Sequence, residues 1–265
     1  MNGTQLLAPT RRTRVLIGVV VGTFVMLPLL ATFEYTLRDG DTHSLVHWLD
    51  VIRPANAAAY QPIWVGLRNS LTLTVATVAI VLLLLAPTML LVNLRYPRLT
   101  RALEYVSLLT LSIPAIVLVV GLAPIYLVIG RTLGTGAWTL AFAYGILVLP
   151  FAMRPLQAQI DAVDVVTLSE AARSLGAGWV QVIVRVLLPN LRSGLLNASL
   201  ITVAVVLGEF TVASLLNRQN LQTALVLVNR QDGYIAVVFT LLALAFCFLL
   251  LLIIGRSGRA GASKD

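Results

Sequence analysis

The stretch YIAVVFTLLALAFCFLLLLII, residues 234–254, decides the class of fold. It contains no charged side chain, and it is longer than the roughly 18 to 20 residues with which a helix crosses a bilayer. A β-barrel would instead present separate segments of about ten residues with alternating polarity. The stretch therefore predicts a membrane-spanning helix.

Outward from this stretch, the rest of the chain has the same character. Of its 265 residues, 58% are hydrophobic and 11% are charged, whereas a soluble domain carries about 25% charged residues. The mean hydropathy of +0.92 agrees. The sequence predicts an all-α, polytopic membrane protein with six transmembrane helices, in the apolar runs 15–33, 67–94, 102–129, 137–152, 195–216 and 234–254.

Prolines shape three of these runs. The second run would be about 42 Å long at 1.5 Å per residue, which exceeds the roughly 30 Å hydrocarbon core, so it must tilt, kink or protrude. Pro87 is its candidate kink. Pro114 and Pro124 make the third run a candidate bending element, although a fixed kink is the alternative. Pro150 and Pro155 are expected to end the fourth run.

Basic residues predict the orientation in the membrane. Arginines and the lysine gather in 1–14, 95–101, 153–194 and 255–265, and fewer lie in the intervening connections. Cytoplasmic segments carry this excess, so both termini and the loop 153–194 are expected in the cytoplasm, with 15–254 as the transmembrane domain. The composition of the tail predicts disorder. We attribute the net charge of +8 to topology and expect no nucleic-acid partner.

The loop begins with a predicted short helix. It contains LSEAARSLGA, residues 168–177. Thr167 and Glu170 fit a capping box, in which a hydroxyl and a glutamate three residues apart start a helix. Gly176 is a natural helix stop.

A second short helix is predicted after a tight turn. In residues 179–187, apolar side chains recur at the spacing of one helical face. Pro189 is expected to end this helix. On these residues alone, the loop is an ordinary capped surface segment.

The loop resembles the EAA signature of binding-protein-dependent ABC importer permeases. That signature is Glu-Ala-Ala, three residues, Gly and, twelve residues later, Leu-Pro. The resemblance runs from about residue 67 to residue 254 and is nearest to polyamine and ferric-iron-type permeases. It departs at Ser193, where many relatives have a second proline. The matching residues are Glu170, Ala171, Ala172, Gly176, Leu188 and Pro189.

The resemblance implies a fold, a role and partners. It implies a type I ABC importer transmembrane fold in a bacterial inner membrane, in which the loop docks on an ATPase subunit. The implied partners are two ATP-binding cassette ATPase subunits, a second permease subunit of the same or a related chain, an extracytoplasmic solute-binding protein and membrane lipid. The implied ATPase-coupling residues are Glu170, Ala171, Ala172, Gly176, Ala177, Leu188 and Pro189.

The chain itself is not expected to be an enzyme. It has no Walker phosphate loop, so ATP would bind to the partner ATPase and no cofactor is expected here. His43 and His47 have a spacing that suits two metal ligands, but a solvated surface is the favoured interpretation and no metal is expected.

Polar residues in the fifth run are candidates for the solute pathway. Glu209 is a carboxylate inside an apolar run, which is costly and by default functional; it lines the pathway or pairs structurally. Asn197 and Thr202 line the pathway or hold helices together.

The cargo is left open. Polyamines such as spermidine or putrescine are favoured, because the length, the six spans and the late EAA loop resemble the smaller polyamine-type permeases. Glu209 and the outer face would also suit a cation. Ferric iron, sulfate, molybdate, thiamine and phosphonate are alternatives. An ion-gradient-driven secondary transporter, with Glu209 as the coupling group, is the alternative of another class. A membrane scaffold or sensor without transport is the third, and the coupling-type loop argues against it.

Overall fold

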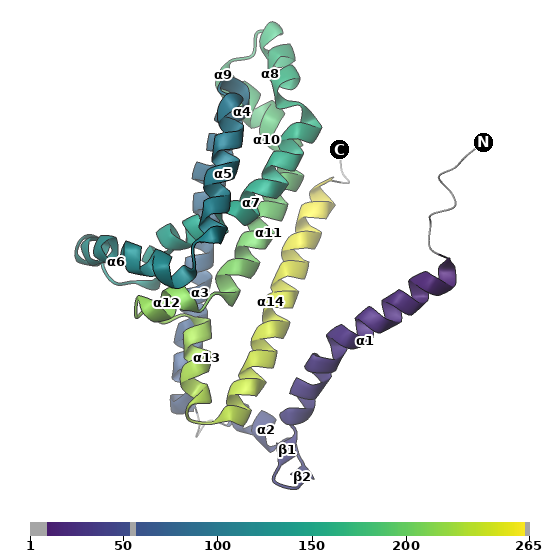
Figure 1. The fold of residues 1–265 in the computed structure, drawn as a ribbon, viewed down its shortest axis with the longest axis vertical. Helices are drawn as coiled ribbons and strands as arrows, with labels where there is room; N and C mark the ends of the chain where they lie inside the picture. Colours follow the sequence, from purple (N-terminus) through teal and green to yellow (C-terminus); the bar gives the residue numbers. More distant parts are fainter. Residues whose placement is uncertain (1–9, 54–56, 263–265) are drawn as a thin grey trace. The chain divides into compact units, whose positions relative to one another are not determined.

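The computed structural model describes residues 10–53 and 57–262, and these are almost entirely helical (Figure 1). The chain forms two compact units. The smaller one comprises Met1–Tyr60 and Val228–Ala243, and the larger one comprises Gln61–Leu227 and Leu244–Asp265. The last helix, α14 (Gly233–Ala262), contributes residues to both.

The smaller unit contains a long helix, a hairpin and a short helix. The two strands of the hairpin pair antiparallel, with Arg38 opposite His43 and Asp39 opposite Thr42. Its elements are α1 (Arg11–Tyr35), β1 (Arg38–Asp39), β2 (Thr42–His43) and α2 (Val46–Ile52).

The larger unit is a bundle whose helices are interrupted in several places. Its α8–α9 turn lies at one end and α13 at the other, and α6 and α12 cross between them (Figure 1). The elements of its first half are α3 (Ala57–Ile80), the π-helical η3 (Val81–Leu85), α4 (Ala86–Arg95), α5 (Arg98–Ser112), α6 (Ala115–Thr132), the 3₁₀ turn η4 (Ala137–Leu140) and α7 (Ala141–Val163). Those of its second half are α8 (Val165–Ser174), α9 (Trp179–Gln181), the π-helical η5 (Val182–Leu187), α10 (Leu188–Asn190), α11 (Arg192–Gly208), α12 (Thr211–Leu215) and α13 (Leu221–Asn229).

Helices α7 and α11 pack closely and form the centre of this unit. A Cβ placed on Gly194 would lie 2.6 Å from Gln159 Cβ and 3.1 Å from the Pro155 carbonyl oxygen. Only a glycine therefore permits this approach, in the way that small residues bring helices together in membranes. On α7, Tyr144 and Leu156 are fully buried.

The expected end of the fourth span at Pro150 and Pro155 is wrong. Helix α7 continues through both prolines to Val163. Each proline removes one helical N–H, but Pro150, Leu156 and Ile160 are buried against neighbouring helices. This packing compensates for the lost hydrogen bonds, as it often does in membrane helices.

The third and fifth spans are not continuous helices, contrary to expectation. The third breaks between α5 and α6, where Ile113 (ψ 119°) and Pro114 (ψ 137°) are extended. The residue before a proline avoids the helical region, which explains the break at Pro114, whereas Pro124 lies inside α6. The fifth breaks at Glu209, which is also extended (ψ 128°).

The second span is one long helix with a wider turn inside it. It is continuous from Ala58 to Arg95 and includes the π-helical segment η3. Pro87 lies two residues after this segment and has no N–H for the carbonyl of Leu83. The helix accommodates Pro87 with a π-helical turn, and the predicted kink stays a prediction.

Among the described residues, five helices are long and apolar enough to cross a membrane. A sixth results if Trp179–Asn190 and Arg192–Gly208, which meet at 68°, form one bent span. The expected all-α membrane fold is confirmed. The expected disorder of the tail is wrong as far as Ala262, because α14 remains helical to that residue.

Candidate functional site

The predicted loop helix is present, but a different residue caps it. Helix α8 begins at Val165, and its N-cap is Asp164 in the left-handed conformation (φ 47°). The Asp164 carboxylate accepts hydrogen bonds from the Thr167 hydroxyl (2.7 Å) and the Thr167 amide (3.3 Å). These bonds lower the pKa of the Asp164 carboxyl group. The capping box of Thr167 and Glu170 is therefore wrong.

The stop at Gly176 is confirmed. Gly176 has φ +88°, and its amide donates to the Arg173 carbonyl (2.9 Å). The Ala177 amide donates to the Ala172 carbonyl (3.1 Å). This pair of bonds is a Schellman motif, which requires a left-handed residue that glycine adopts without strain.

The residues of the EAA-like stretch divide between two faces of α8. Glu170 and Ala171 are exposed, whereas Ala172 is half-buried against the core of the larger unit, as is Ala177 after the turn. Ala172 is thus a packing residue within this chain. The Leu175 side chain, at the tip, is 89% exposed.

The second helix of the loop runs from Trp179 to Asn190 and includes η5. Of its predicted apolar face, only Leu187 is buried, whereas Val180, Ile183 and Val184 are exposed. The other fully buried residue, Val182, lies outside that predicted face. Pro189 lies in the last turn of this helix, which ends one residue later at Asn190. The chain bends one residue after Asn190, at Leu191. Leu188 and Pro189 are exposed beside this bend.

The break at Glu209 is built from polar side chains. The Glu209 carboxylate accepts hydrogen bonds from the Tyr144 hydroxyl (2.6 Å, to Oε2) and the Val212 amide (3.0 Å, to Oε1). It therefore caps α12 and ties it to α7. The Asn220 side-chain amide donates to the Glu209 carbonyl (2.7 Å), and that of Gln222 donates to the Leu207 carbonyl (2.9 Å). These bonds pair two backbone carbonyls that the break leaves without a helical partner.

The far side of the break is anchored to α3. The Ser70 hydroxyl accepts from the Leu221 amide (2.9 Å), and the Asn69 side chain donates to the Gln219 carbonyl (2.9 Å). Gln219 in turn donates to the Pro62 carbonyl (3.1 Å). The sequence does not predict that Tyr144, Asn220 and Gln219 hold the break, because each lies far from its bonding partner in the sequence.

Asn197 and Thr202 do not join this network. Thr202 is fully buried and donates to the Ala198 carbonyl of its own helix (2.7 Å). Asn197 is exposed on α11. A pathway role for Asn197, Thr202 and Glu209 stays a prediction.

Arg218 is a cation held beside α6. The end of α12 is closed by bonds from the Asn217 amide to the Ser214 carbonyl (3.2 Å) and from the Arg218 amide to the Ala213 carbonyl (2.8 Å). One guanidinium nitrogen lies 3.7 Å from the place of a Cβ on Gly130. Its Nε is buried and has no hydrogen-bond partner in the part of the chain that the structure describes.

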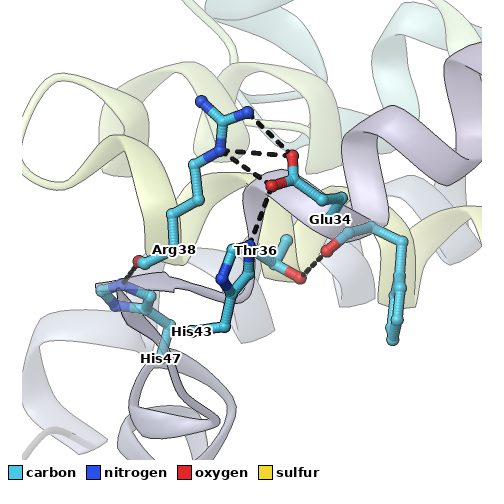
Figure 2. A network of polar contacts seen from close by, with 6 residues as sticks. Glu34, Thr36, Arg38, His43 and His47 are labelled. Atoms are coloured by element: carbon cyan, nitrogen blue, oxygen red, sulfur yellow. Dashed lines mark hydrogen bonds and ion pairs between the residues drawn. The ribbon is translucent and has the colours of Figure 1, made fainter. Parts of the chain in front are cut away.

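The two histidines have other partners than a metal (Figure 2). His43 Nε2 lies 3.1 Å from a carboxylate oxygen of Glu34, and His47 Nε2 lies 2.9 Å from the Arg38 carbonyl oxygen. Glu34 also accepts from Arg38 at 3.0 Å, which raises the pKa of the Arg38 guanidinium. His47 stacks on Tyr234, with ring centroids 4.6 Å apart. Within residues 10–53 and 57–262, no three metal-ligating side chains gather.

A large part of this chain is similar in sequence to known proteins. The family described as the binding-protein-dependent transport system inner membrane component matches residues 88–259. These include the break at Glu209 and the two helices α8 and α9 with the turn between them, which we call the α8–α9 hairpin. The phosphate transport system permease protein PstA of Pasteurella multocida (strain Pm70) is 30% identical over 115 residues. These cover 43% of this chain and 40% of that protein, so the match spans less than half of either.

Proposed function

Because this chain belongs to the family of binding-protein-dependent transport system inner membrane components, we propose that it forms the solute pathway of an ATP-driven importer together with a second permease subunit. It is a multi-pass permease component of such a system. The proposed partners are two ATP-binding cassette ATPase subunits and an extracytoplasmic solute-binding protein. ATP would bind to the ATPase subunits, and this chain would transmit the movement of those subunits to its membrane-spanning helices. The family assignment replaces the ion-driven transporter and the scaffold that the sequence left open.

The α8–α9 hairpin is the proposed contact with the ATPase. The observation that carries this is exposed apolar surface at the turn: Leu175, outside every candidate span, is 89% exposed, and Val180, at the start of the bent helix pair, is 75% exposed. Such surface in a segment outside the bilayer is typical of a protein contact. Glu170 and Ala171 extend the same surface, and the exposed Glu170 carboxylate can accept a charge-assisted bond from a partner arginine.

The hairpin is proposed to be cytoplasmic, together with both termini. Its basic residues support this orientation. The hairpin and α13 lie at opposite ends of the larger unit (Figure 1), so α13 would then lie towards the outer face.

Gentle purification of the tagged protein from its native membrane tests the ATPase contact. We expect a Walker-motif ATPase to co-purify with the wild type and to be lost in Gly176→Asp or Glu170→Lys, while both variants still insert into the membrane. Normal ATPase recovery and normal uptake in both variants would contradict the proposed contact between the hairpin and the ATPase. Recovery of the wild-type chain alone, still moving solute in vesicles without ATP, would contradict the proposal that it belongs to an ATP-driven importer.

For the cargo, we propose a phosphate-like oxyanion in place of the polyamine favoured by the sequence. A cationic cargo would need a free carboxylate, but both oxygens of Glu209 already accept hydrogen bonds within the chain. The nearby segment instead presents Arg218, whose Nε has no partner within the described residues. An ionisable group at such a break is by default a functional candidate. The relative named for phosphate transport supports the same class.

The co-purified solute-binding protein tests the cargo directly. Titration with inorganic phosphate, sulfate, molybdate, spermidine and ferric iron is expected to give saturable binding with an oxyanion. Binding of spermidine or iron alone would contradict the oxyanion proposal and leave the importer assignment intact.

A further inference from the structure

Two guanidinium groups lie over the indole ring of Trp179. The Arg173 guanidinium carbon is 4.8 Å from the ring centroid, and that of Arg95 is 5.6 Å from it. Both distances fall within the roughly 6 Å at which a cation is attracted to an aromatic face. We call these three side chains the Trp179 clasp.

The clasp joins three separate segments of the chain. Trp179 is the first residue of α9, Arg173 lies in the last turn of α8, and Arg95 is the last residue of α4. The first two belong to the hairpin. Arg95 ends the long helix that begins at Ala58 and crosses the larger unit. The clasp is therefore a direct side-chain connection between the proposed ATPase contact and a membrane-spanning helix.

The same end of that helix is fixed to α7 two residues earlier, at Asn93. Asn93 and Gln157 exchange two hydrogen bonds between their side-chain amides (3.1 and 3.0 Å), and Gln157 also donates to Asp161 (2.8 Å). A displacement of α4 at Arg95 would consequently be shared with α7. Helix α7 leads to Tyr144 and the Glu209 break.

No acidic side chain competes for the two arginines. Neither Arg95 nor Arg173 forms an ion pair with a residue that the structure describes. The ring is thus the contact that orients both guanidinium groups. Since the π-helical η3 lies inside the same long helix, that helix also contains a turn able to absorb a change of register.

We propose that Trp179 is a positioning residue that transmits movement of the α8–α9 hairpin to α4 and, through Asn93 and Gln157, to α7. This rests on the proposed contact of the hairpin with an ATPase. Trp179 need not touch the ATPase or the solute. Trp179 acts by making α4 move together with the hairpin when the ATPase subunits close.

The test compares Trp179→Ala, Trp179→Phe and the wild type in the complete complex, purified with its ATPase in lipid nanodiscs. Trp64→Ala is the matched control, because it removes an exposed tryptophan (61%) from a helix outside the hairpin. Hydrogen exchange of α8–α10 and of α4 is measured without nucleotide and after trapping with ATP and vanadate, so the cargo need not be known.

In the wild type and in Trp64→Ala, we expect trapping to change exchange in both the hairpin and residues 86–95. In Trp179→Ala, the ATPase should still co-elute and the hairpin should still respond, but the response of residues 86–95 should fall at least fivefold. Trp179→Phe, which keeps an aromatic face, should retain most of it.

An unchanged response of residues 86–95 in Trp179→Ala would overturn the proposal. So would loss of the ATPase from that variant, since Trp179 would then be a docking residue. If the wild-type hairpin itself neither responds to trapping nor retains an ATPase, the proposed coupling role fails, and the clasp with it.

Discussion

The Tyr144 hydroxyl donates a 2.6 Å hydrogen bond to Glu209 Oε2, and this bond joins the fully buried face of α7 to the break between α11 and α12. The two residues are 65 positions apart. Because Asn220 also donates to the Glu209 carbonyl, the break is held from two directions. The bent fifth span is thus a defined, bonded structure.

Tyr144→Phe is expected to weaken this break. It removes the donor and leaves a Glu209 oxygen with one fewer partner, which costs about 1–3 kcal/mol for a buried group. The thermal midpoint of the purified protein in detergent measures the effect. Tyr105→Phe is the control, because Tyr105 is 70% exposed. Equal midpoints for the two variants would show that the bond contributes nothing.

Gly176 is predicted to be the residue of the hairpin least tolerant of branched side chains. Its φ of +88° is strained for any other residue, and a Cβ there would meet no atom within 4 Å, so conformation alone is tested. Gly176→Val should destabilise the hairpin by roughly 1–2 kcal/mol. Gly176→Asn should be milder, because asparagine visits this region more readily. Hydrogen exchange of the Gly176 and Ala177 region compares them, and similar exchange in both variants would contradict this account.

Gly194→Ala is expected to separate α7 from α11. The new Cβ would meet Gln159 Cβ at 2.6 Å and backbone at 3.1 Å, so the helices must move. Overpacking of this kind costs about 1–3 kcal/mol. Gly208→Ala, on the same helix with no atom within 4 Å, is the control. The thermal midpoint should fall only for Gly194→Ala.

Asp164 makes the start of α8 sensitive to acid. Bonds from the Thr167 hydroxyl and amide lower the pKa of the Asp164 carboxyl group. Its stabilising effect is therefore present above the pKa of the unfolded state and is lost as the pH falls through the lower pKa of the folded state. Exchange at the Thr167 amide, corrected for intrinsic rates, should gain protection as the pH rises through the lowered pKa of the folded state and should level off above the pKa of the unfolded state. The protection of Asp164→Asn, which keeps an acceptor but cannot titrate, should not change over this range, and parallel profiles would refute the assignment.

Arg218 is predicted to matter for uptake more than for folding. Arg218→Gln removes a charge that has no ion-pair partner in residues 10–53 and 57–262, so the thermal midpoint should change little. Uptake of labelled inorganic phosphate by proteoliposomes with the complete importer should fall at least tenfold. Arg131→Gln, an exposed arginine at the end of α6, should transport normally. Normal uptake in Arg218→Gln would remove Arg218 from the pathway.

Features that depend on neighbouring residues follow from the sequence. Apolar runs predict the membrane class, because the bilayer requires length and hydrophobicity that local composition supplies. Gly176 predicts the end of α8 for the same reason, since a left-handed closing residue is a local requirement. The cap of α8 was misassigned by three residues, because Thr167 satisfies the capping pattern while Asp164 makes the bonds.

Features that depend on distant partners were decided only by the tertiary structure. Pro150 and Pro155 read as helix ends, yet packing of α7 carries the helix through both. Glu209 reads as an isolated carboxylate in an apolar run, yet Tyr144 and Asn220 arrive from other helices to bond with it. Arg95 and Trp179 carry no signal in sequence, since they meet only when α4 reaches the hairpin. The sequence by itself determined which segments are helical and apolar, because those are local properties. Where those helices break and what holds the breaks was set by contacts that exist only once the chain is folded.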